Sequence, residues 1–120
     1  MNKRQTGARY EDIAVSFLES NGTRVIKRNF RCRIGEIDII GFHEGVLVFF
    51  EVKYRNSEKY GNAAEAVGEK KKQVISKVSD YFRCINQRYM NYPIRYDVIA
   101  IQNEEIFWYK NAFEYAGNSF

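Results

Sequence analysis

Residues 35–55, GEIDIIGFHEGVLVFFEVKYR, carry the pattern that decides the fold. Two runs rich in Ile, Val and Phe flank the pair Glu44-Gly45, and such runs favour pleated strands. Glycine readily adopts the positive φ that tight hairpin turns require. We therefore expect an antiparallel hairpin with Glu44 and Gly45 at its turn.

This turn determines which residues of the two strands lie opposite each other. Ile39 is expected opposite Phe50, and one step further from the turn Asp38 is expected opposite Glu51. Alternation along each strand puts Asp38, Glu51 and Lys53 on one face. The other face is apolar and holds Ile37, Ile39, Phe50 and Val52. Because two facing carboxylates repel by about 0.2–1 kcal/mol, the pattern indicates a compensating cation.

Oxygen ligands of this kind suit a hard divalent cation such as Mg²⁺ or Mn²⁺, which binds one or two carboxylates, waters and a phosphate oxygen. Lys53, two residues after Glu51, has the charge needed to hold an attacking water or to stabilise a phosphate. The alternative is an exposed ion pair of Lys53 with the acids, which is worth little. The adjoining VLVFF run favours a functional role, because acids at the end of a buried strand are costly.

Asp38 and the triplet Glu51-Val52-Lys53 match the D…(D/E)-x-K pattern of the PD-(D/E)xK nuclease superfamily, although Ile37 stands where the superfamily name has proline. Over nearly its whole length the chain resembles the YraN-like family of small bacterial proteins, which are similar to Holliday-junction resolvases. The matching segments are 7–11, 35–38, 50–53, Ala66-Val67 with Lys71, 95–98 and 108–113.

The resemblance implies a metal-dependent endonuclease that cleaves DNA phosphodiester bonds, including branched DNA such as Holliday junctions. Asp38 and Glu51 would hold Mg²⁺ or Mn²⁺, with the Val52 carbonyl as a third ligand. Lys53 would orient the attacking water, and Glu11 would complete the catalytic group. A homodimer would supply the paired sites that cutting two strands requires.

Two further stretches have helical periodicity. Residues 6–21 place an apolar stripe on one side, with Thr6 as the N-cap and Asn21-Gly22 as the stop. Glu11 lies at the rim of this stripe, where it either joins the active site or complements the helix dipole. A second helix is expected from about Gly68 to between Phe82 and Ile85.

Lysines cluster at the start of this second helix. Lys71 is directed toward the sheet, because apolar residues follow it at i+3, i+4 and i+7. The chain has a net charge of +4, which is compatible with a nucleic-acid partner. We expect contacts to DNA phosphates from Lys70, Lys71, Lys72, Arg33 and Arg55. The alternatives are a solvated helix face and a basic sheet edge that blocks pairing.

The remaining strands are expected at residues 25–33, 94–101 and 106–110, with a polar loop at 55–62. The order α-β-β-β-α-β-β then describes an α/β domain with a central mixed five-stranded sheet flanked by helices. The resemblance implies that this is a restriction-endonuclease-like domain, and 120 residues are enough for one such domain over 1–120.

Several classes of function are excluded. Cys32, Cys84 and His43 provide no spacing for a zinc site or a histidine triad, and His43 is expected on the surface at the hairpin tip. Asp97 is expected to form an ion pair with a neighbouring arginine, and the alternative is that it borders the site. The absence of an apolar leader or of a transmembrane run predicts a cytoplasmic protein with no membrane partner.

Two other functions remain open. The first is a non-catalytic nucleic-acid-binding protein that retains the nuclease fold, since its distribution of charge would be much the same. The second is an interaction protein in which the acidic pair is only structural.

Overall fold

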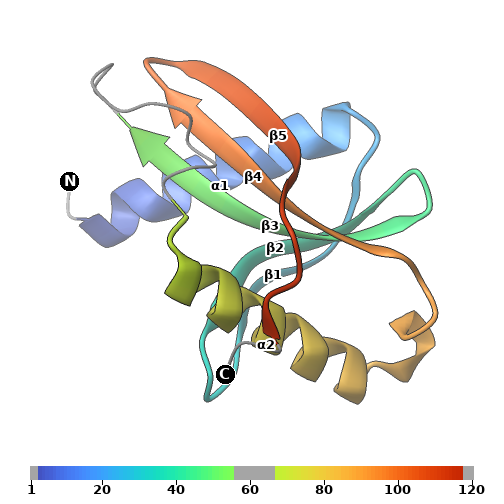
Figure 1. The fold of residues 1–120 in the computed structure, drawn as a ribbon. Helices are drawn as coiled ribbons and strands as arrows, with labels where there is room; N and C mark the ends of the chain where they lie inside the picture. Colours follow the sequence, from blue (N-terminus) through green and yellow to red (C-terminus); the bar gives the residue numbers. More distant parts are fainter. Residues whose placement is uncertain (1–2, 56–66, 118–120) are drawn as a thin grey trace.

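The computed structural model describes residues 3–55 and 67–117 (Figure 1). Its elements are α1 (Lys3–Ser20), β1 (Arg24–Arg31), β2 (Glu36–His43), β3 (Val46–Arg55), α2 (Glu69–Ile85), the short 3-10 helix η2 (Gln87–Tyr89), β4 (Ile94–Gln102) and β5 (Glu105–Phe113). This is the expected order α-β-β-β-α-β-β, and the mixed α/β fold class is confirmed.

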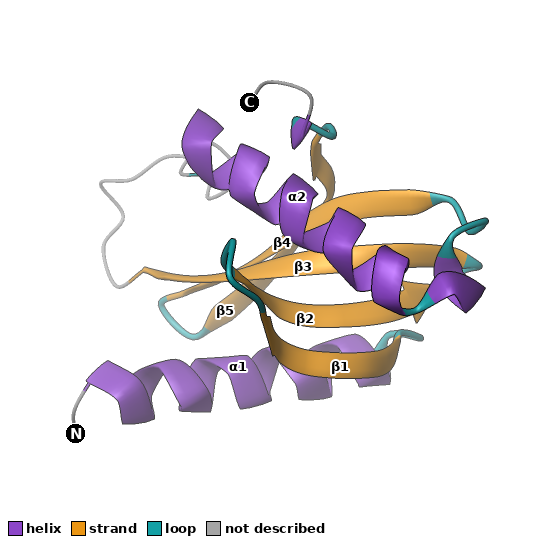
Figure 2. Ribbon diagram, turned by 90° about the horizontal axis from the view of Figure 1, so that it is seen from below, coloured by secondary structure: helices purple, strands orange, loops and turns teal. Residues whose placement is uncertain are grey.

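The five strands form one sheet in the order β1-β2-β3-β4-β5. Strands β3 and β4 are parallel, and the other neighbouring pairs are antiparallel. Parallel neighbours need a crossover, and the chain makes it through α2. Figure 2 shows α2 lying across one face of the sheet, while α1 lies on the other side.

Strand β3 is buried on both faces. Phe49 packs on the α2 side with Val78 and Phe82, whereas Phe50 packs on the α1 side with Ala14 and Leu18. A strand covered by helices on both faces needs apolar side chains at every position. This explains the continuous apolar run that precedes Glu51.

The predicted hairpin turn is confirmed, since Glu44 and Gly45 have φ values of 51° and 80°. The register is also confirmed as far as the pair Ile39 and Phe50, where the paired part of β2 and β3 ends. One expected feature is wrong: Ile37 packs on the α2 side, while Ile39 packs on the α1 side.

The break in alternation has a local cause. Asn29 of β1 lies between the residues that pair with Ile39 and Ile37, and its φ is 52°. The neighbouring strands are therefore distorted at this level, and Asp38 lies at the distortion. Asp38 and Glu51 are consequently not a ladder pair, and the Asp38 carboxylate accepts a hydrogen bond from the Val52 N–H instead.

Some element boundaries differ from the expected ones. Helix α1 begins at Lys3, so Thr6 lies inside the helix and is not its N-cap. Strand β1 ends at Arg31, which leaves Arg33 in the β1–β2 turn. Strand β5 continues to Phe113, because that ring is buried in the α2-side core. None of the described helices is long and apolar enough to span a membrane.

His43 is not the surface residue that its place at the hairpin tip predicted. It is only 4% exposed, and its ring centroid lies 4.7 Å from that of Trp108. The reason is that β5 brings Trp108 over the end of the hairpin. The carboxylate of Asp97, which is fully buried, accepts a hydrogen bond from the Trp108 Nε1–H at 2.8 Å.

Asp97 pairs with an arginine, Arg95, as the sequence predicted, and its role is structural. Its carboxylate also accepts two hydrogen bonds from the Arg95 guanidinium, at 2.8 and 2.9 Å, and one from the Asn111 N–H at 2.8 Å. These bonds fix β5 on β4 where their register shifts, between Tyr96 and Val98. Every bond that a buried carboxylate needs is thus supplied by neighbouring residues.

We predict that Asp97→Ala lowers the free energy of unfolding by about 3–5 kcal/mol, because it leaves the partly buried Arg95 charge and the Trp108 and Asn111 N–H groups without their acceptor. Asp12→Ala is the matched control, since Asp12 forms an exposed ion pair with Arg28. The control should cost less than about 1 kcal/mol. Urea denaturation measures both, and equal losses would contradict the structural role of Asp97.

Candidate active site

The candidate site lies where β2 and β3 separate. Asp38 is partly buried there, and its Oδ2 accepts the Val52 N–H at 2.8 Å. Burial raises the pKa of Asp38, and the bond from the Val52 N–H opposes this rise without cancelling it. The Val52 N–H, which would otherwise continue the ladder between β2 and β3, therefore orients the Asp38 carboxylate.

Glu51 is the most buried acid of the group, with 7% of its surface exposed. Its Oε1 lies 3.7 Å from Lys53 Nζ and 3.9 Å from Lys71 Nζ. Burial and the nearby charge of Asp38 raise the pKa of Glu51 to about 7, while the two lysines act to lower it. Burial and the charge of Asp38 therefore disfavour ionisation of Glu51 even with two cations beside it.

Lys71 reaches Glu51 from α2, as its position on the helix predicted. The β1–β2 turn packs closely beneath this helix at Gly35. A Cβ on Gly35 would lie 2.5 Å from the Val74 Cγ1, so a larger residue would force the Val74 side chain or the helix to shift. The glycine therefore helps to hold Lys71 near the sheet.

Glu11 approaches Asp38 from α1. Its Oε1 accepts a hydrogen bond from Asn29 Nδ2 at 2.7 Å and lies 3.5 Å from Arg28 Nε. Burial raises the pKa of Glu11, and the charge of Asp38 adds to the rise. The charge of Asp38 thus acts on Glu11, whereas the hydrogen bond and the ion pair of the Glu11 carboxylate come from Asn29 and Arg28 of β1.

The structure brings together Glu11, Asp38, Glu51, Lys53 and Lys71. Among the described residues, no three His, Cys, Asp or Glu side chains are close enough to hold one metal ion together. A metal centre here would accordingly use Asp38 and Glu51, together with the Val52 carbonyl. Two carboxylates satisfy Mg²⁺, which keeps several waters as ligands. The shared burial and mutual repulsion of the two acids fit a site for such a cation.

The other predicted DNA contacts come from α2, the β1–β2 turn and the end of β3. Lys70 is exposed beside Lys71, whereas Lys72 is bonded to Glu69 at 3.0 Å. Arg33 is exposed in the β1–β2 turn. Arg55 is the last residue of β3, and most of the loop expected at 55–62 lies outside the described residues.

The sequence did not single out the residues that support Glu11. Asn29 and Arg28 hold its carboxylate, and Asn29 has a positive φ of 52°, which no local pattern predicts. A second unforeseen feature is the stack of Tyr10 on Tyr54, with ring centroids 3.8 Å apart. The only sequence signal for it is that these tyrosines adjoin Glu11 and Lys53.

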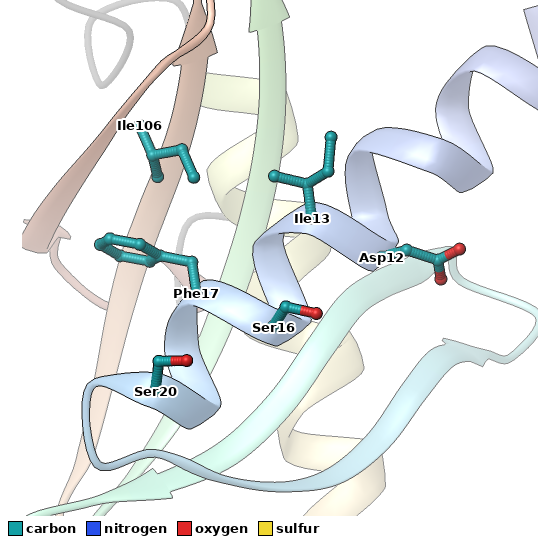
Figure 3. A pocket seen from close by; sticks show the side chains of 6 residues that line it. All are labelled: Asp12, Ile13, Ser16, Phe17, Ser20 and Ile106. Atoms are coloured by element: carbon teal, nitrogen blue, oxygen red, sulfur yellow. The ribbon is translucent and has the colours of Figure 1, made fainter.

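Another hollow, on the opposite side of the sheet, carries no comparable chemistry. It has a volume of about 470 Å³ and lies between α1 and β5. In Figure 3, the Phe17 side chain points toward β5, which carries Ile106, whereas the Asp12 carboxylate points away from both. Asp12 is the only ionisable residue of its lining, so this hollow lacks the grouped acids and lysines of the candidate site.

Together, these features define a small α/β protein with a carboxylate and lysine cluster at the divergence of two central strands. The model of the uncharacterised protein family UPF0102 matches residues 10–101, and the chain belongs to this family, which is the YraN family that the sequence resembled. A UPF0102 protein of Lachnoclostridium phytofermentans is 39% identical over 118 residues, covering 98% of this chain and all of that protein. A UPF0102 protein of Caldicellulosiruptor bescii is 44% identical over 101 residues, covering 84% and 85% of the two chains.

The raised pKa of Glu51 predicts how stability depends on pH. The folded state binds the proton more tightly than the unfolded chain, so this contribution is complete below pH 4.5 and is lost as the pH rises through about 7. In chelator-treated buffer, Glu51→Gln should therefore gain stability relative to the wild type between pH 4.5 and 8. The gain should be at most about 3 kcal/mol.

Urea denaturation across this pH range measures the difference. Glu105→Gln is the control, because Glu105 is exposed and begins β5 away from the acids. Its difference from the wild type should not change with pH. A flat profile for Glu51→Gln would mean that Glu51 titrates as an ordinary surface acid.

Proposed function

We propose that this protein is a metal-dependent endonuclease that cleaves DNA phosphodiester bonds. The observation that carries the proposal is the placement of Glu51, which is buried near Asp38 with the amino groups of Lys53 and Lys71 within 4 Å of its carboxylate. Acids and lysines grouped in this way supply a cation site and positive charge for a phosphate. The match of Asp38 and Glu51-Val52-Lys53 to the D…(D/E)-x-K pattern, and the resemblance of the sequence to Holliday-junction resolvases, support the assignment.

Asp38 and Glu51 would hold Mg²⁺ or Mn²⁺, with the Val52 carbonyl as the third protein ligand. When bound, such a cation polarises a phosphoryl oxygen and lowers the pKa of a bound water. The bond from the Val52 N–H fixes the orientation of the Asp38 carboxylate, and it leaves the other oxygen available.

The two lysines have separate roles in this proposal. Lys53 is partly buried on the same strand as Glu51, and it orients the attacking water and stabilises the charge that develops on the phosphate. Lys71 is more exposed and contacts a phosphate oxygen from α2. Glu11 is a positioning residue, because its carboxylate holds Arg28 and Asn29 of β1, the strand that pairs with the strand of Asp38.

Phosphate contacts along the DNA backbone are assigned to Lys70, Lys72, Arg33 and Arg55. Such contacts carry no sequence information, so the protein would bind DNA of any sequence and would recognise structure, including branched DNA. Cleavage of both strands of a junction would require a homodimer with two such sites.

A non-catalytic nucleic-acid-binding protein is the second candidate. The observation that favours it is that Lys53 and Lys71 already lie beside Glu51. Two ammonium groups compensate much of the charge of the two acids without a cation. In that case the cluster would stabilise the fold and the lysines would contact phosphates without turnover.

The cleavage assay separates these candidates. We predict that wild-type protein with Mn²⁺ cuts linear, flapped or four-way DNA, and that Glu51→Gln and Lys53→Ala each lower the rate at least about a hundredfold, because both residues act at the reacting phosphate. DNA affinity should change much less. The control Lys110→Ala removes an equal charge beside Trp108, away from the acids.

Cleavage that requires the cation and is lost only in the two site variants supports the nuclease. Equal cleavage by all four proteins would come from a contaminant and would overturn the assignment. Tight DNA binding without any cleavage would favour the non-catalytic candidate.

A further inference from the structure

Two adjoining hollows lie at the end of the sheet beside the β2–β3 turn. Their volumes are about 350 and 220 Å³, and both are lined by Arg88 and Tyr89. We call them together the Arg24–Arg88 groove, which is defined by Arg24, Lys27, Phe42, Arg88, Tyr89 and Tyr92. None of these residues belongs to the candidate active site.

Cations and rings alternate along this groove. The Arg24 guanidinium lies 5.3 Å from the centre of the Phe42 ring, and the Arg88 guanidinium lies 4.8 Å from that of Tyr89. Phe42 in turn packs on Tyr89 and Tyr92, with centroids 5.4 and 4.8 Å away. Tyr92 remains 44% exposed, so one side of this array is open to solvent.

The charge of the groove has no partner in the described part of the chain. No carboxylate lines either hollow, and Arg24, Lys27 and Arg88 form no ion pair with any described residue. Other arginines of the protein are paired with acids, namely Arg28, Arg31, Arg83 and Arg95. Three cations without an acidic partner along the two adjoining hollows fit a polyanionic partner.

We propose that the Arg24–Arg88 groove binds an unpaired, single-stranded segment of the nucleic-acid substrate, which rests on the function proposed above. The cations contact phosphates, and the exposed ring of Tyr92 and the guanidinium planes stack on bases. A double helix hides the faces of its bases, so it can use only the cations. The groove therefore selects substrates that have a single strand on this side of the active site.

The groove and the active site lie near opposite ends of α2. Lys71 is near the start of the helix, and Ile85, which lines the groove, is the last residue. Fourteen residues of helix correspond to about 21 Å along the axis. Figure 2 shows α2 lying across one face of the sheet. One strand that contacts both places must therefore span about 21 Å.

Fluorescence anisotropy with labelled oligothymidylates of increasing length tests the groove without cleavage. The protein carries Glu51→Gln and the buffer contains a chelator. We expect affinity to rise steeply once the strand is long enough to span about 21 Å, and Arg24→Gln/Arg88→Gln should abolish this rise. For a strand of about 14 nucleotides, the slope of log affinity against log salt should be smaller by about 1.4, because two phosphate contacts are lost.

The control Arg9→Gln/Lys110→Gln removes the same charge elsewhere, since Lys110 packs on Trp108 of the α1-side core. It should keep the length dependence and nearly the full salt slope. Tyr92→Leu should weaken binding of the long strand about fivefold or more while leaving the salt slope unchanged, because it removes a stacking ring but no charge. Urea denaturation checks that each variant is folded.

Equal losses in the groove and control variants would overturn the inference, as would tighter binding of a duplex of equal length or no binding of any strand. If the groove variants weaken binding but the wild type cuts no DNA, the nuclease proposal fails and the groove inference stands. If the wild type cuts DNA but the groove variants bind like the control, the inference fails and the nuclease proposal stands. An oligouridylate that binds equally well extends the groove to RNA.

Discussion

The candidate site depends on one hydrogen bond, which runs from the Val52 N–H to the Asp38 carboxylate. The ladder between β2 and β3 ends at Ile39 and Phe50, and beyond it the backbone of β3 needs another acceptor. Asp38 supplies it, and in doing so it is drawn into the space between the two strands. Its burial, and its effect on the pKa of Glu51, both follow from that position.

Two layers of helix keep this arrangement in place. Helix α1 brings Glu11 near Asp38, and Arg28 and Asn29 of β1 hold the Glu11 carboxylate, while α2 brings Lys71 to Glu51. The acids therefore lie between a group of hydrogen-bond donors on one side and ammonium groups on the other. Asp97 is fully buried, but its carboxylate is fully bonded by residues of β4 and β5. A buried carboxylate with all its hydrogen bonds, such as Asp97, stabilises the fold. Buried carboxylates that repel each other, such as Asp38 and Glu51, form a site that can bind a cation.

The sequence predicted the hairpin turn, the order of elements and the inward direction of Lys71, because these follow from local periodicity and turn chemistry. It did not predict that Ile37 and Ile39 face opposite sides, since the distortion at Asn29 arises only when β1 pairs with β2. The burial of His43 was missed for a similar reason, because it depends on Trp108 of a distant strand. The Arg24–Arg88 groove joins residues from β1, β2 and the segment around η2, so no single stretch of sequence reveals it.

The central claim is that Asp38 and Glu51 form a cation site, and thermal unfolding with Mn²⁺ tests it most directly. Asp38→Asn is the matched variant, since an amide oxygen can still accept the Val52 N–H while the charge is lost. At a hundredfold excess over its dissociation constant, a cation that binds only the folded state stabilises it by about 2.7 kcal/mol. This is a rise in Tm on the order of 10 °C for a domain of this size. We predict that chelator-treated wild type shows this rise and that Asp38→Asn shows little of it. Equal rises in both proteins, or none in either, would contradict the account.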